Sequence, residues 1–254
     1  MRLIRSFCIA FSMYSRLPVP HTEWTEDDMR YVMCFFPLIG AVIGLVLIAW
    51  TSLAAHWEIG KALFAGVAAV IPAVLTGGIH LDGFCDTLDA LGSRQPMERK
   101  LEILKDSNSG AFAVMGCCIY FLLLFCLWQE WALNGKSLCI LAVGFVLSRV
   151  LSGLSVVCFP CAKNSGLLAM FSHTADKRRT AWVLAAYLVL SAAFLLLVDA
   201  RTGAAVLIAA LAAFGYYRWM SVREFGGTTG DLAGWFLQLC ELAILLAAVI
   251  VQKI

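Results

Sequence analysis

Long apolar runs separated by short polar segments dominate the pattern along the chain. Seven runs approach the roughly 20 residues that an α-helix needs to cross about 30 Å of hydrocarbon. They cover residues 34–55, 62–79, 111–128, 138–161, 181–198, 203–220 and 232–251. The runs are continuously apolar and do not alternate as the strands of a membrane β-barrel would. The pattern therefore predicts an all-α, polytopic membrane bundle of about six to seven transmembrane helices.

The composition strengthens this prediction. Of 254 residues, 61% are hydrophobic and 14% are charged, and the mean hydropathy is +0.85. Soluble domains average ~25% charged residues, and disordered chains are less apolar still. Lys and Arg number 19 against 17 Asp and Glu, so the net charge of +2 provides no basic surface for nucleic acid. We expect a single membrane domain over residues 1–254, a lipid bilayer around it and no nucleic-acid partner.

The distribution of basic residues predicts the orientation of the chain. If the N-terminus is cytoplasmic and each run crosses once, most Lys and Arg residues fall on the inner side. This asymmetry is the positive-inside signature. We expect a multi-pass protein of the cell (inner) membrane, with the N-terminus and the active site facing the cytoplasm. Residues 1–20 are predicted to form an interfacial segment, because their apolar stretch is short and carries no cleavage site.

The polar segment after the second run carries acidic residues at helical spacing. Asp82, Asp86 and Asp89 stand at i, i+4 and i+7, so a helix places all three on one face. No Lys or Arg between Lys61 and Arg94 offsets their repulsion. A divalent cation would do so, and oxygen ligands favour Mg²⁺ or Mn²⁺ over zinc. A solvated acidic face is the alternative, but three carboxylates in register beside an apolar run favour a metal site.

Two further segments on the same predicted side widen the candidate site. Lys105 and Asp106 end a second predicted helix at 97–106, where Lys105 is either a phosphate contact or an ordinary exposed charge. A glycine-rich loop, 226–231, precedes the seventh run and can present backbone N–H groups to a phosphate at a helix N-terminus. Phosphate contacts are therefore expected at Gly226, Gly227, Thr228 and Gly230.

Two charged residues interrupt apolar runs. Arg149 lies in the fourth run and Glu241 in the seventh. An unpaired charge there costs at least ~2.5 kcal/mol, so Arg149 needs either Glu241 or an anionic ligand as its partner. Carboxylates for a metal beside groups for phosphates suit phosphoryl transfer. A proton-coupled transporter is the alternative, but its ionisable groups belong near the midplane of repeated halves, and the acidic residues here crowd one face.

The motifs together resemble one enzyme family. The block Gly77-Gly78-Ile79-His80-Leu81-Asp82-Gly83, followed by Asp86 and Asp89, is similar to the signature of cobalamin-5′-phosphate synthases, or adenosylcobinamide-GDP ribazoletransferases. So are 101–107 with Gly110, and 226–231 with Gly234 and Glu241. The resemblance covers essentially the whole chain, with Gln238 standing where the family often has Glu. A more distant similarity to CDP-alcohol phosphatidyltransferases is the alternative, although Asp86-Thr87 replaces the Ala-Arg pair of that motif.

The resemblance implies an enzyme of late cobalamin biosynthesis. Its substrates would be adenosylcobinamide-GDP and α-ribazole or α-ribazole 5′-phosphate, joined with loss of GMP in a Mg²⁺-dependent reaction. The expected Mg²⁺ ligands are Asp82, Asp86, Asp89, Asp106 and Asp231. Lys105 and Arg149 are expected to contact phosphate, and Asp89 or His80 to accept the proton of the attacking hydroxyl. The acidic connection and residues 162–180 are expected to cradle the corrinoid.

Overall fold

The computed structural model describes residues 2–20, 24–162, 170–171 and 174–254. In this part of the chain, regular structure is helical apart from one isolated bridge between Cys161 and Thr228. The helices are α1 (Arg2–Tyr14), α2 (Glu26–Met29), α3 (Val32–His56), α4 (Lys61–Thr76), α5 (Ile79–Gly92), α6 (Met97–Ile103), α7 (Ala111–Glu130), α8 (Gly135–Cys158), α10 (Lys177–Val198), α11 (Ala200–Phe225) and α12 (Gly230–Lys253). The predicted all-α membrane bundle is confirmed.

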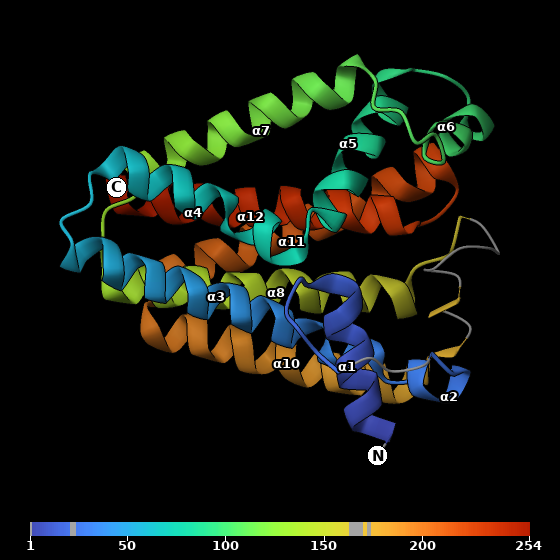
Figure 1. The fold of residues 1–254 in the computed structure, drawn as a ribbon, viewed down its shortest axis with the longest axis horizontal. Helices are drawn as coiled ribbons and strands as arrows, with labels where there is room; N and C mark the ends of the chain where they lie inside the picture. The colour runs from blue at the N-terminus through green and yellow to red at the C-terminus, as the bar shows by residue number, and fades with distance from the viewer. Residues whose placement is uncertain (1, 21–23, 163–169, 172–173) are drawn as a thin grey trace.

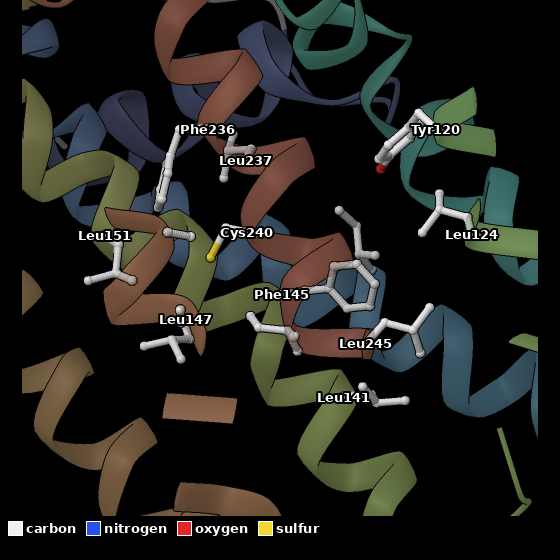
Figure 2. Close-up of a cluster of buried hydrophobic side chains, with 14 of the residues drawn as sticks. Tyr120, Leu124, Leu141, Phe145, Leu147, Leu151, Phe236, Leu237, Cys240 and Leu245 are labelled. Atoms are coloured by element: carbon white, nitrogen blue, oxygen red, sulfur yellow. The ribbon is translucent and has the colours of Figure 1, made fainter. Parts of the chain in front are cut away.

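Six helices among the described residues are long and apolar enough to cross a bilayer: α3, α7, α8, α10, α11 and α12. They run along the long axis of the molecule (Figure 1). Helix α8 packs against α3, α10 and α12, and α12 packs against α11. Figure 2 shows apolar side chains from α8 and α12 filling the space between these central helices. By contrast, α7 and α10 expose most of their surface, as helices at the lipid boundary do.

The second predicted run, 62–79, does not form one straight span, which corrects the sequence-based expectation. Helix α4 ends at Thr76, and the chain bends by 97° into α5. Gly77 and Gly78 make the bend with φ values of +65° and +81°, a left-handed conformation that glycine adopts without steric cost. The side chain of Arg16 also lies against Gly77, where a Cβ atom would collide with it. Helix α4, with 16 residues, is shorter than the six spans, and α5 turns away from it at the bend.

The polar connections gather at one end of the bundle. Figure 1 shows α5, α6 and the start of α12 together at this end, whereas the α3–α4 and α7–α8 turns lie at the other. Helix α1 lies across the bundle and packs on α3, and Ser6 Oγ donates a hydrogen bond to the Asp28 carbonyl at 2.6 Å. Much of the expected corrinoid cradle at 162–180 falls on residues 163–169 and 172–173, outside the described residues.

Candidate active site

Two glycines allow α5 to cross the start of α12 in backbone contact. A Cβ atom on Gly83 would lie 2.7 Å from Asp231 Cα, and one on Gly234 would lie 2.9 Å from the His80 carbonyl oxygen. Both glycines belong to the motifs quoted above, but their role depends on how two distant segments pack. The crossing brings the acidic face of α5 beside the first turn of α12.

At this crossing, the charges of four predicted ligands act on the fifth, Asp86. Burial, and then the neighbouring carboxylates, raise the pKa of Asp86 to about 7. In decreasing order of effect, these neighbours are Asp82, Asp231, Asp89 and Asp106. The side chains of Asp86, Asp89 and Asp231 are half-buried, and those of Asp82 and Asp106 are exposed. Gly83 lies against Asp231 and Asp89 binds the Gly110 N–H group, so α5 contacts both the start of α12 and the end of the α6–α7 connection, whereas the shared ligand set stays a prediction.

Asp89 also has a structural role that sequence reasoning missed. Its two carboxylate oxygens accept hydrogen bonds from the backbone N–H groups of Gly110 and, at 2.8 Å, Ala113. These donors belong to the N-terminus of α7, where the first N–H groups lack partners within the helix. Asp89 thus fastens α5 to α7, and its engaged oxygens give the predicted base role no support from this geometry. The sequence Ser-Asn-Ser-Gly at 107–110 indicates that a helix begins after it, but it does not show that the N-terminus of this helix is capped by a residue of α5.

The α6–α7 connection is held in place by polar contacts. Asp106 accepts hydrogen bonds from the Asn108 backbone N–H at 3.0 Å and side-chain amide at 2.9 Å, which lower its pKa. Lys100 on α6 is buried and pairs with Glu224 near the end of α11. Lys105, a predicted phosphate contact, is exposed beside Asp106. These contacts position Asp106 and Lys105 at the solvent-facing edge of the carboxylate cluster.

The chemistry of the cluster fits a magnesium ion, because all its donors are carboxylate oxygens and like charges gather there. The positions of these side chains fit an ion less well than their chemistry does. Across residues 2–20, 24–162, 170–171 and 174–254, no group of three or more His, Cys, Asp or Glu side chains is arranged to hold a metal ion. The set of ligands predicted from sequence is brought to one place but is not closed around a single point.

The glycine-rich loop has a different role from the predicted one. The backbone N–H groups of Gly226 and Gly227 donate to carbonyl oxygens of the last turn of α11, at 3.1 Å each, and that of Thr228 donates to the carbonyl of Pro160, just after α8, at 2.8 Å. The buried hydroxyl of Thr228 pairs with that of Tyr217. Gly226 and Gly227 therefore cap α11, Thr228 ties the turn to the segment that follows α8, and the N–H groups of all three are not free to meet a phosphate. Gly230 begins α12, where the first-turn N–H groups are free of intrahelical partners.

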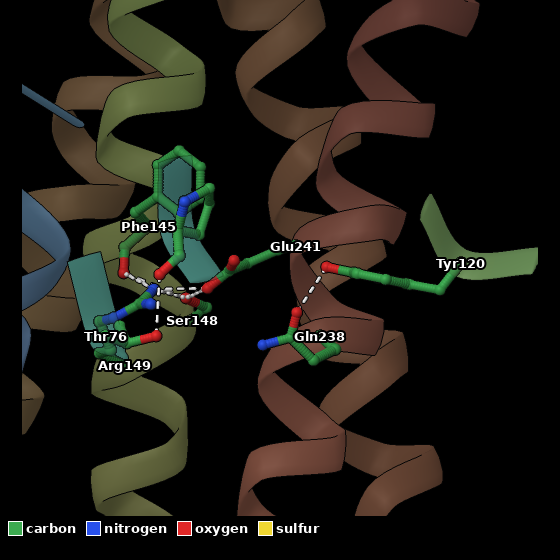
Figure 3. A network of polar contacts seen from close by, with 8 residues as sticks. Thr76, Tyr120, Phe145, Ser148, Arg149, Gln238 and Glu241 are labelled. Atoms are coloured by element: carbon green, nitrogen blue, oxygen red, sulfur yellow. Dashed lines mark hydrogen bonds and ion pairs between the residues drawn. The ribbon is translucent and has the colours of Figure 1, made fainter. Parts of the chain in front are cut away.

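Arg149 pairs with Glu241, one of the two partners that the sequence left open. Its side chain is fully buried, and its Nη1 donates to Glu241 Oε1 and to the Phe145 carbonyl, the latter at 3.0 Å. Ser148 donates to the same Glu241 oxygen at 3.2 Å (Figure 3). The Nε and Nη2 atoms of Arg149 are buried and have no hydrogen-bond partner in the described part of the chain, and the phosphate contact stays a prediction.

Gln238 links α12 to α7. Its side-chain oxygen accepts a hydrogen bond from the Tyr120 hydroxyl at 2.6 Å (Figure 3). This is the position where the sequence departs from the Glu that the family often carries. Because either side chain provides an oxygen acceptor, the departure leaves the contact with α7 intact.

His80 lies away from the carboxylates. Its buried ring stacks on Tyr14 at 5.8 Å between centroids and meets the edge of Phe36 at 5.7 Å. Burial, and then the charge of Arg149, lower the pKa of His80 to about 3. The imidazole is therefore neutral, packed toward α1 and α3, and its predicted role as the base has no support from the geometry.

Comparison with known proteins identifies the family of this chain. A model of the cobalamin-5-phosphate synthase family matches residues 6–249. A protein of Lachnoclostridium phytofermentans named adenosylcobinamide-GDP ribazoletransferase is 47% identical over 254 residues, covering 100% of this chain and 97% of its own. Proteins of the same name from Pseudomonas putida and Desulfitobacterium hafniense are 35% and 34% identical, covering 94% and 98% of this chain and 96% and 98% of their own. No solved structure matches. The chain belongs to the cobalamin-5-phosphate synthase family.

Proposed function

We propose that this protein joins adenosylcobinamide-GDP to α-ribazole, or to α-ribazole 5′-phosphate, with release of GMP. The observation that carries the proposal is Asp86, a half-buried carboxylate on α5 whose pKa is raised by burial and by the charges of four other aspartates. The names of the relatives describe an activity of this kind. A phosphodiester exchange needs positioned charge more than covalent chemistry, and a carboxylate cluster suits that need.

The proposed reaction exchanges one phosphorus–oxygen bond for another. The ribose 3′-hydroxyl of the ribazole attacks the phosphorus attached to cobinamide, and the bond from this phosphorus to the GMP oxygen breaks. The hydroxyl proton passes to a carboxylate of the cluster. Asp82, Asp86, Asp106 and Asp231 would hold Mg²⁺, while Asp89 keeps α5 fastened to α7. When bound, the ion supplies positive charge for the diphosphate and the departing GMP.

We place this reaction on the cytoplasmic side of the cell (inner) membrane. The support is the excess of Lys and Arg in the connections at the carboxylate end of the bundle, together with a nucleotide-linked substrate. Exposed Lys105 at the edge of the cluster is the phosphate contact that we retain from the sequence analysis.

The decisive experiment measures GMP release from adenosylcobinamide-GDP and α-ribazole by the purified protein in detergent. We expect release to require Mg²⁺ and to fall at least ~10²-fold in Asp86→Asn, because the charge at the centre of the cluster is lost. Asp27→Asn is the matched control, since Asp27 on α2 is exposed and pairs with Arg2 on α1. Near-wild-type release by a folded Asp86→Asn protein would refute the role of the cluster.

A further inference from the structure

Helices α5 and α7 pack against each other in an antiparallel arrangement. A Cβ atom on Gly116 of α7 would collide with Leu88 Cδ1 of α5, and the rings of Phe84 and Tyr120 lie 5.0 Å apart between centroids. Residue numbers therefore fall along α5 as they rise along α7. The two helices are close enough for short side chains between these two levels to touch.

Two cysteines meet at the level between these contacts. The thiol of Cys85 on α5 is in hydrogen-bond contact with the thiol of Cys117 on α7, so the two side chains point toward each other. Both cysteines are free, and both are partly exposed. Cys85 directly precedes Asp86, the half-buried carboxylate of the candidate site. A pair of thiols that the proposed reaction does not use therefore lies beside the site.

We propose that Cys85 and Cys117 form a reversible disulfide that joins α5 to α7 next to the candidate active site. The oxidant is a small disulfide of the class of oxidised glutathione. One protein thiolate attacks it and releases the first small thiol, and the second protein thiolate then attacks the mixed disulfide and releases the other. Two S–H bonds are replaced by one S–S bond, and the two electrons and two protons leave with the small thiols.

The surroundings of Cys85 make this disulfide slow to form. Burial, and then Cys117 and the carboxylates of Asp86 and Asp82, raise the pKa of Cys85 to about 12. Because the thiolate is the attacking species, Cys85 acts second, when a mixed disulfide on Cys117 already holds the target sulfur beside it. The pair is therefore reduced in the resting protein, and sustained oxidation joins it.

The disulfide should lower the activity, an expectation that rests on the proposed function. An S–S bond is about 2.05 Å long, shorter than a non-bonded contact between two sulfur atoms. Its formation therefore draws Cys85, and with it Asp86, toward α7. Since a displacement of about 1 Å can cost ~10²-fold in rate, we expect GMP release to fall at least about tenfold and to recover when the bond is reduced.

The first test detects the bond itself. The full chain in detergent is incubated with oxidised glutathione, its remaining thiols are alkylated, and it is digested without reductant. Mass spectrometry should find the peptide of Cys85 joined to that of Cys117, and dithiothreitol should separate them. Cys117→Ser should abolish the linked peptide. Cys118→Ser is the matched control, because Cys118 is the next residue and is exposed, and this variant should retain the linked peptide.

The second test measures GMP release by the same samples. Oxidation should lower the release by the wild type and by Cys118→Ser, dithiothreitol should restore it, and Cys117→Ser should be insensitive to both. Circular dichroism verifies that the helices of each variant are formed.

The two readouts separate the disulfide from the proposed reaction. Glutathione retained on either cysteine in place of the linked peptide, or no reaction after prolonged oxidation, overturns the disulfide. Full GMP release by cross-linked wild type overturns its effect on the site. Absence of GMP release before oxidation would refute the proposed reaction alone, because the linked peptide is scored independently of activity.

Discussion

Asp86 is the residue on which the candidate site converges. It lies half-buried on α5, and the neighbouring charges that raise its pKa most are the carboxylates of Asp82 and Asp231. Taking a carboxylate partly out of water and placing it beside like charges both favour its protonated form. The site is therefore under electrostatic strain that a cation or a proton relieves. Arg149 shows the opposite arrangement, because its buried charge is compensated within the protein by Glu241.

The raised pKa of Asp86 predicts a pH dependence of stability in metal-free protein. Its folded pKa of about 7 exceeds the ~3.9 of an unfolded Asp, so the native state binds more protons between these values. The free energy of unfolding should therefore fall as pH rises from about 4 to 7. Asp86→Asn should remove this contribution, which thermal unfolding in detergent with a chelator measures from pH 4 to 8. Wild-type and variant curves of the same shape would contradict the prediction.

The buried ion pair predicts strong coupling between two residues. Arg149→Met or Glu241→Met alone leaves a buried charge without its partner, which typically costs ~3–5 kcal/mol. The double variant removes both charges, so we expect it to be more stable than either single variant. Chemical or thermal unfolding of the four proteins in detergent gives the coupling energy. If the two losses simply add, Arg149 and Glu241 do not depend on each other.

At the scale of elements, the site depends on one bend and one crossing. The Gly77–Gly78 bend turns α5 away from the direction of α4, and Gly83 against Asp231 and Gly234 against His80 let α5 lie directly on the start of α12. Asp89 then fastens α5 to α7, and Lys100 fastens α6 to α11. Short helices outside the spans are thus fixed by a few specific contacts with the spanning helices. The positions of the carboxylates follow from these contacts.

The crossing predicts an effect of adding one methyl group. Gly83→Ala places a Cβ atom against the Asp231 backbone, so α5 and α12 must move apart. Since a displacement of about 1 Å can cost ~10²-fold in rate, we expect GMP release to fall by one to two orders of magnitude, roughly, with the helices still formed. Gly215→Ala on α11 is the control, because a Cβ atom there meets nothing within 4 Å. Similar activity of the two variants would show that the crossing tolerates separation.

At the scale of the whole molecule, the bundle separates two ends with different chemistry. Helices α5 and α6 and the start of α12, which carry the candidate site, lie at one end, and the α3–α4 and α7–α8 turns lie at the other. The central helices α8 and α12 join the ends and carry the Arg149–Glu241 pair between them. This separation suits an enzyme that takes polar substrates from one side of a bilayer.

The predicted orientation of the chain implies which connections can be labelled from each side of the membrane. A cysteine introduced at the exposed position Asn108 should react with a membrane-impermeant maleimide only from the cytoplasmic side, whereas one at Lys136 should react only from the opposite side. Wild-type protein provides the background, because it already contains 10 cysteines. Labelling of both positions from the same side would contradict the predicted orientation.

Local patterns in the sequence were enough to predict the helices and the acidic face. The apolar runs have the length of spans, and i, i+4, i+7 spacing places three aspartates together in any α-helix. Both properties depend on neighbours in the chain. The expected ligand set, the magnesium ion and the orientation remain predictions, although packing does bring the acidic helix α5 against Asp231 at the start of α12.

Only the tertiary structure decided the contacts between distant segments. Arg149 pairs with Glu241, and Asp89 caps the N-terminus of α7. The Thr228 hydroxyl points inward to Tyr217, and His80 lies among aromatic rings. In each case the sequence offered a polar group but not its partner. Which partner it meets depends on how helices cross and rotate against one another, and that is set by the packing of the whole bundle.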